Sequence, residues 1–173
     1  MLELTILLFL NSCPSPKQHE THTGVQSQPK KTYLIGHRGA AGLMPENTLA
    51  AFRRACEIGV DAIELDVLLT ADKKIVVYHD FSLKPEITRT SDGKWIKDHS
   101  SLTISNLTLA QLKQYDVGRL KPGTRYARRY PNQQPVDGER IPTLREVVLL
   151  IKKQCNPAIQ IWIEIKTSPE KPQ

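Results

Sequence analysis

The chain contains 173 residues, of which 39% are hydrophobic, and its formal net charge at pH 7 is +6. The basic residues are scattered and lack the continuous basic face with interleaved aromatics that is typical of nucleic-acid-binding proteins, so no nucleic-acid partner is expected. No apolar run is long enough for a transmembrane helix. The three cysteines, at positions 13, 56 and 155, show neither metal-type spacing nor a disulfide framework, and Cys56 is expected to be a small buried apolar group.

Residues 1–31 form a leader that differs in composition from the rest of the chain. An apolar stretch at residues 2–10 is followed by Asn-Ser-Cys13 and then by a polar, proline-containing segment over residues 14–31. This order resembles the cleavage box of a bacterial lipoprotein, which implies a lipid on Cys13, membrane anchoring through it and a location in the bacterial periplasm or cell envelope. Because Glu3 interrupts the apolar stretch and no basic region precedes it, a wrongly chosen start or a disordered leader stays open, with a cytoplasmic location as the alternative.

Residues 32–173 carry the periodic patterns of an α/β fold. Gly59 is placed to end the first helix, and Thr143 is followed three residues later by Glu146, which predicts a capping box at the start of the last helix. The residues between the second and third strands are turn-like rather than helical. The predicted elements, in chain order, are a strand at 33–36, a helix at 48–58, strands at 62–67 and 75–79, helices at 108–112 and 143–154, and a strand at 159–166.

A long segment at about residues 81–142 separates the third strand from the last helix. It has little periodicity and is rich in turn residues, as in Ser91-Asp92-Gly93 and Asp137-Gly138. A connection of this length is either functional or irregular. The segment is therefore predicted to be an insertion within one domain.

Ionisable residues follow or end several of the predicted strands. Side chains two residues apart on a strand point the same way, so Glu64 and Asp66 share a face, as do Glu164 and Lys166. Barrels and open α/β sheets build their sites at the carboxyl ends of strands, which predicts a functional site here. The residues are His37 and Arg38, Glu64 and Asp66, His79 and Asp80, and Glu164 and Lys166.

Together these motifs resemble the first half of the glycerophosphodiester phosphodiesterase family, over about residues 32–166. The motifs are Gly-His37-Arg38-Gly, Pro-Glu46-Asn47-Thr, Glu64-Leu-Asp66, His79-Asp80 and Glu164-Ile-Lys166, and residues 122–144 resemble the insertion of bacterial members. The resemblance implies a fold of the TIM-barrel type, a divalent metal, and hydrolysis of glycerophosphodiesters, as small-molecule substrates, to glycerol 3-phosphate and an alcohol. A complete barrel takes about 250 residues. The chain therefore corresponds to a barrel truncated after about four strands.

The chemistry of phosphodiester cleavage assigns roles to the motif residues. Glu64, Asp66 and Glu164 offer hard oxygen ligands for Ca2+ or Mg2+, and by resemblance they are the metal ligands. His37 and His79 have the near-neutral side chains that proton transfer needs, and the resemblance makes them catalytic.

For several of the remaining motif residues, a functional role and a purely structural role are both compatible with the sequence. Arg38 and Lys166 could hold the phosphoryl group, although an ion pair with the neighbouring carboxylates is equally compatible for Lys166. By resemblance Glu46 is a possible further metal ligand, and Glu46 and Asn47 are candidates for a second shell around the metal. Capping of the helix at 48–58 is the competing interpretation for both.

Two functional alternatives stay open. A lipid phosphodiesterase of the same superfamily, similar to sphingomyelinase D, would use the same motifs. A non-catalytic fragment or surface lipoprotein that retains the motifs is the other alternative, because four strands leave the last strand with an exposed edge.

Overall fold

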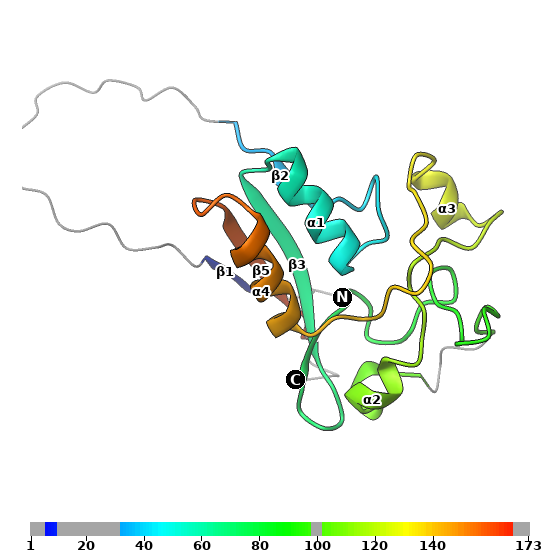
Figure 1. The fold of residues 1–173 in the computed structure, drawn as a ribbon. Coiled ribbons are helices and arrows are strands. Elements are labelled where there is room, and N and C mark those ends of the chain that lie inside the picture. The colour runs from blue at the N-terminus through cyan, green and yellow to red at the C-terminus, as the bar shows by residue number, and fades with distance from the viewer. Residues whose placement is uncertain (1–5, 10–31, 98–101, 168–173) are drawn as a thin grey trace, which may run out of the picture.

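The computed structural model describes residues 6–9, 32–97 and 102–167 (Figure 1). Its sheet has the strand order β1-β5-β3-β2, and β4 pairs with β3 as well. The strands are β1 (Ile6–Phe9), β2 (Ile35–Gly36), β3 (Ala62–Leu69), β4 (Ile75–Val77) and β5 (Gln160–Ile165). The helices are α1 (Leu49–Ile58), α2 (Leu109–Leu112), α3 (Arg125–Arg129) and α4 (Leu144–Gln154), with a 3-10 turn at Ile104–Asn106.

Neighbouring strands β2, β3 and β5 run parallel and form the centre of the fold. Helix α1 connects β2 to β3, and α4 leads into β5, so the chain alternates between strand and helix as α/β barrels do. Figure 1 shows α1 and α4 lying beside the sheet. The predicted α/β fold is confirmed, and the parallel arrangement matches part of a barrel.

The strand count needs one correction. Strand β4 was expected to be a fourth barrel strand, but it runs antiparallel to β3, with Val67 opposite Val77 and Leu69 opposite Ile75. The turn between them is closed by hydrogen bonds between Thr70 and Lys74. Because β3 extends beyond the end of β2 and the chain then folds back along it, β4 is one arm of a hairpin.

Strand β1 lies antiparallel against β5, with Ile6 opposite Ile165 and Phe9 opposite Trp162. The edge of β5 that was expected to be exposed is therefore paired over these residues. Cys13 lies outside the described residues, and the predicted leader and lipid anchor stay predictions. Within the part of the chain that the structure describes, no helix is long and apolar enough to cross a membrane.

The helix ends are set by local side-chain contacts that the sequence indicated. Thr48 is the N-cap of α1 and accepts a hydrogen bond from the Ala51 amide, and Gly59 ends the helix in the left-handed conformation, with a φ of 77°. Thr143 and Glu146 form the predicted capping box of α4. The alternative that Asn47 caps α1 is wrong, because Thr48 has that position.

The two faces of β3 have different surroundings. Ile63, Leu65 and Val67 belong to a buried apolar cluster that also contains Phe52 of α1 and Val147 of α4. Alternation along a strand places Glu64 and Asp66 on the opposite face. Since the helices cover the outer face of an α/β barrel, these two carboxylates point to the barrel interior.

The insertion at about residues 81–142 has its own buried core despite its irregular backbone. Leu83, Ile87, Ile104, Leu112 and Ile141 pack together, and the cluster continues onto β3 and β4. The structure confirms the short helix at 109–112 as α2 and adds α3, which was not predicted.

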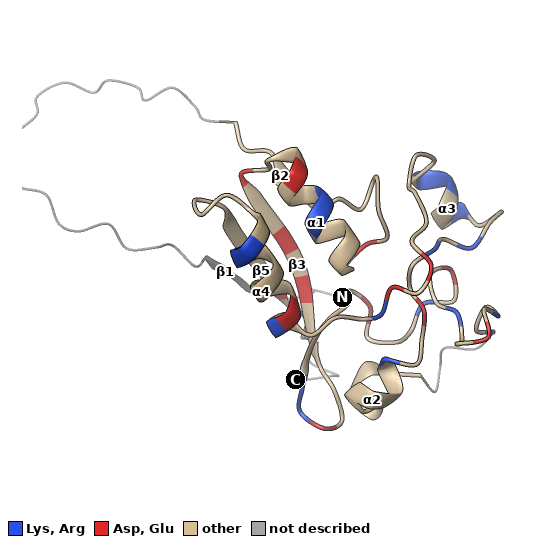
Figure 2. Cartoon of the chain, viewed as in Figure 1, with Lys and Arg blue, Asp and Glu red and all other residues tan. Residues whose placement is uncertain are grey.

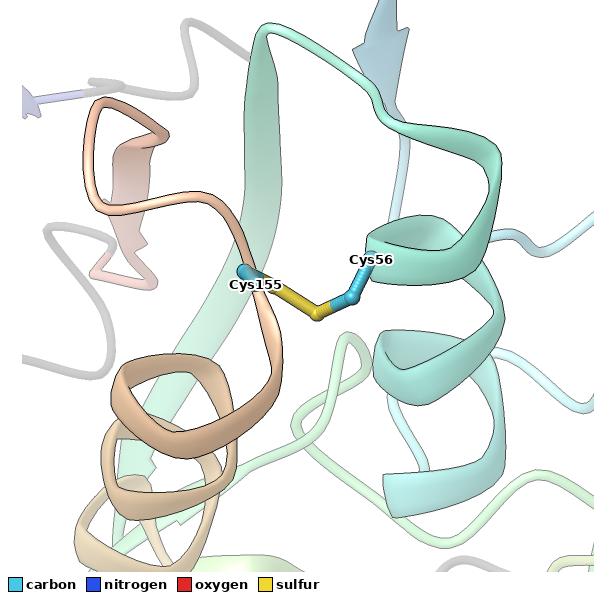
Figure 3. Close-up of a disulfide and its surroundings, with 2 residues drawn as sticks. All are labelled: Cys56 and Cys155. Carbon is cyan, nitrogen blue, oxygen red and sulfur yellow. A yellow bond between two sulfur atoms is a disulfide. The ribbon is translucent and has the colours of Figure 1, made fainter.

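Cys56 and Cys155 form a disulfide between the last turn of α1 and the end of α4 (Figure 3). Their Cα atoms are 4.6 Å apart, although 99 residues separate them in sequence. The expectation that the chain has no disulfide framework is therefore wrong. The spacing of the cysteines in the sequence did not reveal the pair. The two cysteines come together because α1 and α4 pack side by side in the fold.

Candidate active site

Three carboxylates form a cluster on the face of the sheet opposite the helices, where Figure 2 shows acidic positions on β3. Asp66 and Glu164 are direct partners in the parallel register of β3 and β5, and Glu64 lies two residues before Asp66 on the same face. One carboxylate oxygen from each lies within 4.8 Å of the others. The structure therefore brings together the three residues that were predicted to hold a metal.

The electrostatics of this cluster suit a hard cation. Burial and the charge of Asp66 raise the pKa of Glu64 to about 7, because a second negative charge is unfavourable there. The side-chain Nδ2 of Asn47 donates to Asp66 Oδ2 at 2.9 Å. The side-chain oxygen of Asn47, Oδ1, is buried without a hydrogen-bond partner among the described residues. Oxygen donors of this kind are those that Ca2+ and Mg2+ prefer, so the residues fit a divalent metal.

Lys166 provides a positive charge within the cluster. Its Nζ lies 2.5 Å from Glu164 Oε1 and 3.1 Å from Asp66 Oδ1. Burial disfavours the charge, but the hydrogen bond to Glu164 and the charge of Asp66 outweigh it and raise the pKa of Lys166. The ion-pair alternative for Lys166 is thus the arrangement seen, and its role in binding a phosphoryl group stays a prediction.

The loop after β2 contacts Glu64 and places Arg38 in the site. The Arg38 amide donates to Glu64 Oε2 at 2.7 Å, and both Arg38 and Asn47 have positive φ angles, of 50° and 55°. Positive φ is rare outside glycine and is typical of functional loops. Gly39 is required here because a Cβ would lie 2.8 Å from the Ala51 backbone.

The Arg38 side chain is fixed by two carboxylates. Its Nη1 donates to Glu46 Oε1 at 2.9 Å, and its Nε lies 3.6 Å from Asp66 Oδ2. Burial acts against the charge, but Glu46 and Asp66 raise the pKa of Arg38 overall. Glu46 is therefore a partner of Arg38, and its place in a second shell around a metal stays a prediction.

The two histidines reach the site by different routes. His37 directly follows β2, and its pKa is lowered by partial burial and by the charge of Arg38, against the opposing effects of Asp66 and Glu46. A lowered pKa keeps this imidazole neutral at pH 7, as a proton acceptor requires. His79 was expected at the end of a parallel strand, but it follows the returning strand of the β3–β4 hairpin. The preceding residue, Tyr78, lies next to Asp66, because its backbone amide donates to the Asp66 carbonyl at 3.0 Å.

Asp80 orients the imidazole of His79. His79 Nδ1 and Asp80 Oδ1 are 3.1 Å apart, and Lys84 Nζ lies 3.7 Å from the other oxygen of Asp80. Burial alone would raise the pKa of Asp80, but the contacts with His79 and Lys84 lower it. The ionised carboxylate favours the tautomer with hydrogen on Nδ1, which leaves Nε2 free for proton transfer.

Tyr126 and Lys84 are site residues that sequence reasoning missed. The Tyr126 hydroxyl donates to Glu46 Oε2 and lies 3.4 Å from Arg38 Nη1, and Lys84 Nζ lies 3.9 Å from the centre of the Tyr126 ring. Tyr126 belongs to α3, which begins after Gly-Thr124 with Thr124 as its N-cap. That capping pattern could have predicted the helix. No pattern indicated the contact of Tyr126 with Glu46, which lies 80 positions earlier.

Comparisons with known proteins identify the family of the chain. The family described as "Glycerophosphoryl diester phosphodiesterase family" matches residues 37–173. A glycerophosphodiester phosphodiesterase of Caldanaerobacter subterraneus subsp. tengcongensis is 44% identical over 122 residues, which cover 70% of this chain and 41% of that protein. A glycerophosphodiester phosphodiesterase of Bacillus subtilis is 33% identical over 135 residues, or 76% of this chain and 40% of that protein.

Solved structures show the same relationship. A crystal structure from Silicibacter pomeroyi DSS-3 that carries the same family name has a TM-score of 0.77 and 36% identity, and the match covers 85% of this chain and 49% of that one. A phosphodiesterase of Oleispira antarctica in complex with the product sn-glycerol-3-phosphate has a TM-score of 0.55 and 30% identity, over 80% of this chain and 46% of that one. The chain spans less than half of the length of these relatives. Its sheet and helices correspond to part of a TIM-barrel-like fold, and the chain belongs to the glycerophosphodiester phosphodiesterase family.

Proposed function

We propose that this chain carries the metal-binding and proton-transfer residues of a glycerophosphodiester phosphodiesterase, which releases glycerol 3-phosphate and an alcohol. The observation that carries the proposal is the cluster of Glu64, Asp66 and Glu164 within 4.8 Å, flanked by two histidines and Arg38. Three carboxylates so close together are costly unless cations join them, and Lys166 supplies only one positive charge, so the cluster suits a further cation. We further propose that the cation is Ca2+ or Mg2+.

The chemistry requires charge stabilisation and two proton transfers. A bound divalent metal would supply Lewis-acid stabilisation of the phosphoryl oxygens. Arg38 holds a phosphoryl oxygen through its guanidinium, and Asp66 and Glu46 keep that guanidinium in place. One imidazole, of His37 or His79, removes the proton from the attacking hydroxyl or water, and the other protonates the alcohol as its bond to phosphorus breaks.

A binding experiment tests the proposal without requiring turnover. Calorimetry on the purified chain after EDTA treatment is expected to show binding of Ca2+ or Mg2+, followed by metal-dependent binding of sn-glycerol 3-phosphate. Glu64→Gln should weaken both, whereas Glu57→Gln, an exposed carboxylate paired with Arg54 on α1, should weaken neither. Equal affinities in the two variants would overturn the assignment of Glu64.

An activity assay distinguishes the alternatives. Metal-dependent release of glycerol 3-phosphate from glycerophosphocholine supports the proposed reaction. Cleavage of sphingomyelin in its place supports the sphingomyelinase-D-like alternative. Binding of metal without cleavage of either substrate supports the non-catalytic alternative.

We also propose a location in the bacterial periplasm or cell envelope, with a lipid on Cys13 as the anchor. The disulfide between Cys56 and Cys155 supports it, because disulfides form and persist in oxidising compartments. Labelled fatty acid should appear on the expressed protein and be lost in Cys13→Ser. Recovery of unlabelled protein with free thiols from the cytoplasm would contradict the proposal.

A further inference from the structure

The side chain of Tyr126, in the insertion, contacts Glu46 in the site. The carboxylate of Glu46 is shared between two donors: its Oε1 accepts from Arg38 Nη1 at 2.9 Å, and its Oε2 accepts from the Tyr126 hydroxyl. The side chain of Glu46 is only 3% exposed, so water cannot readily replace a lost donor. The phenol therefore fixes the carboxylate that in turn fixes the guanidinium.

Few other contacts hold the guanidinium of Arg38. Among the described residues its buried Nε has no hydrogen-bond partner, and it lies 3.6 Å from Asp66 Oδ2, beyond hydrogen-bonding distance. Within the part of the chain that the structure describes, Nη1 makes the hydrogen bonds of this group, with Glu46 at 2.9 Å and with the Tyr126 oxygen at 3.4 Å. The orientation of the Arg38 guanidinium thus depends on hydrogen bonds with Glu46 and Tyr126, and Tyr126 comes from the insertion.

The ring of Tyr126 contacts the other side of the site. Lys84 Nζ lies 3.9 Å from the ring centre, a distance at which an ammonium is attracted to the aromatic face. Lys84 also lies 3.7 Å from Asp80, which holds His79. Through its hydroxyl and its ring, Tyr126 connects the loop of Arg38 with the loop of His79.

We propose that Tyr126 is a positioning residue that holds the Arg38 guanidinium, through Glu46, in the orientation that binds a phosphoryl oxygen. The functional consequence rests on the proposed phosphodiesterase activity, whereas the orientation of Arg38 does not. Figure 2 shows basic residues on α3, so the helix that supplies Tyr126 also adds positive charge beside a site for an anionic substrate.

A purely structural role for Tyr126 is the competing explanation, because its ring also packs edge-on against Tyr130, with centroids 5.4 Å apart. Tyr126→Phe distinguishes the positioning role from the structural role, since it keeps the ring contacts with Lys84 and Tyr130 and removes only the hydroxyl. Tyr130→Phe is the matched control, because it removes a phenolic hydroxyl from the C-cap of the same helix and leaves the contacts of Glu46 in place.

The first readout is the NMR spectrum of the Arg38 guanidinium, assigned with Arg38→Lys. In the wild-type chain and in Tyr130→Phe, hindered rotation should give separate Nη signals for Arg38. In Tyr126→Phe these signals should merge by exchange. Separate signals that persist in Tyr126→Phe would overturn the proposal, whatever the activity of the chain.

The second readout is function. Tyr126→Phe should weaken metal-dependent binding of sn-glycerol 3-phosphate and lower kcat/KM about 10- to 100-fold, because small misplacements of a binding group cost up to about 10²-fold. Ca2+ affinity and Tm should match those of Tyr130→Phe. Joint loss of Ca2+ affinity and Tm would show a structural role and overturn the proposal. Separate Arg38 signals in a wild-type protein that cleaves no diester, with merging only in Tyr126→Phe, would overturn the phosphodiesterase assignment and leave the positioning role standing.

Discussion

Asp66 on β3 and Glu164 on β5 lie directly opposite each other in a parallel pair of strands, although 98 positions separate them in the chain. Both side chains extend from the same face, and Lys166 bridges them with Nζ at 3.1 Å from one and 2.5 Å from the other. Strand register therefore sets the geometry of the predicted metal site, and the loops add the groups around it.

The raised pKa of Glu64 predicts a pH-dependent stability in the absence of metal. The folded pKa of about 7 lies above the usual 4.5, so the folded state binds a proton more tightly than the unfolded state. The resulting stabilisation is fully present below about pH 4.5 and is lost as the pH rises through about 7. Urea unfolding in EDTA at pH 5 and pH 8 should show a larger drop for the wild type than for Glu64→Gln. Equal drops would show that Glu64 ionises normally.

Replacing a histidine should affect turnover rather than metal binding. His37→Ala and His79→Ala are each expected to lower kcat by about 10²- to 10⁴-fold, the usual contribution of a positioned acid or base. Calorimetry should find a nearly unchanged Ca2+ affinity in both, because neither imidazole belongs to the carboxylate cluster. A variant with wild-type turnover would identify its histidine as structural.

The disulfide should stabilise the fold substantially. Cross-linking two residues across a loop of about 100 residues stabilises a protein by up to about 4.7 kcal/mol on the chain-entropy estimate. Reduction, or the double substitution of Cys56 and Cys155 by serine, should lower the urea midpoint accordingly. Cys13→Ser serves as the control and should leave the midpoint unchanged. A midpoint insensitive to reductant would show that the bridge does not form in solution.

Gly39→Ala should destabilise the chain more than Gly93→Ala does. Both glycines have positive φ, of 80° and 82°, which costs alanine about 1–2 kcal/mol. At Gly39 the added Cβ would also lie 2.8 Å from the Ala51 backbone, whereas no atom lies within 4 Å at Gly93. Thermal unfolding of the two variants measures the difference, and equal Tm values would contradict the close approach of this loop to α1.

Local patterns predicted most of the secondary structure and the carboxylate cluster. Apolar periodicity and capping residues such as Thr143 act over a few positions, so the sequence displays them directly. The count of β4 as a barrel strand was wrong although the turn-like link at residues 70–74 is too short for a parallel connection, which needs a crossover of a dozen or more residues. The contact between Tyr126 and Glu46 and the pairing of Cys56 with Cys155 were not found, since both depend on which elements pack together over long separations.

The β3–β4 hairpin has a consequence for the order in which the site can form. Tyr78 binds the Asp66 carbonyl across only 12 residues of chain, whereas Glu164 reaches Asp66 across 98. The entropy of closing a loop grows with its length, so the short contact can form while the long one is still open. During synthesis, His79 would therefore reach its place beside Asp66 well before the ribosome has delivered Glu164.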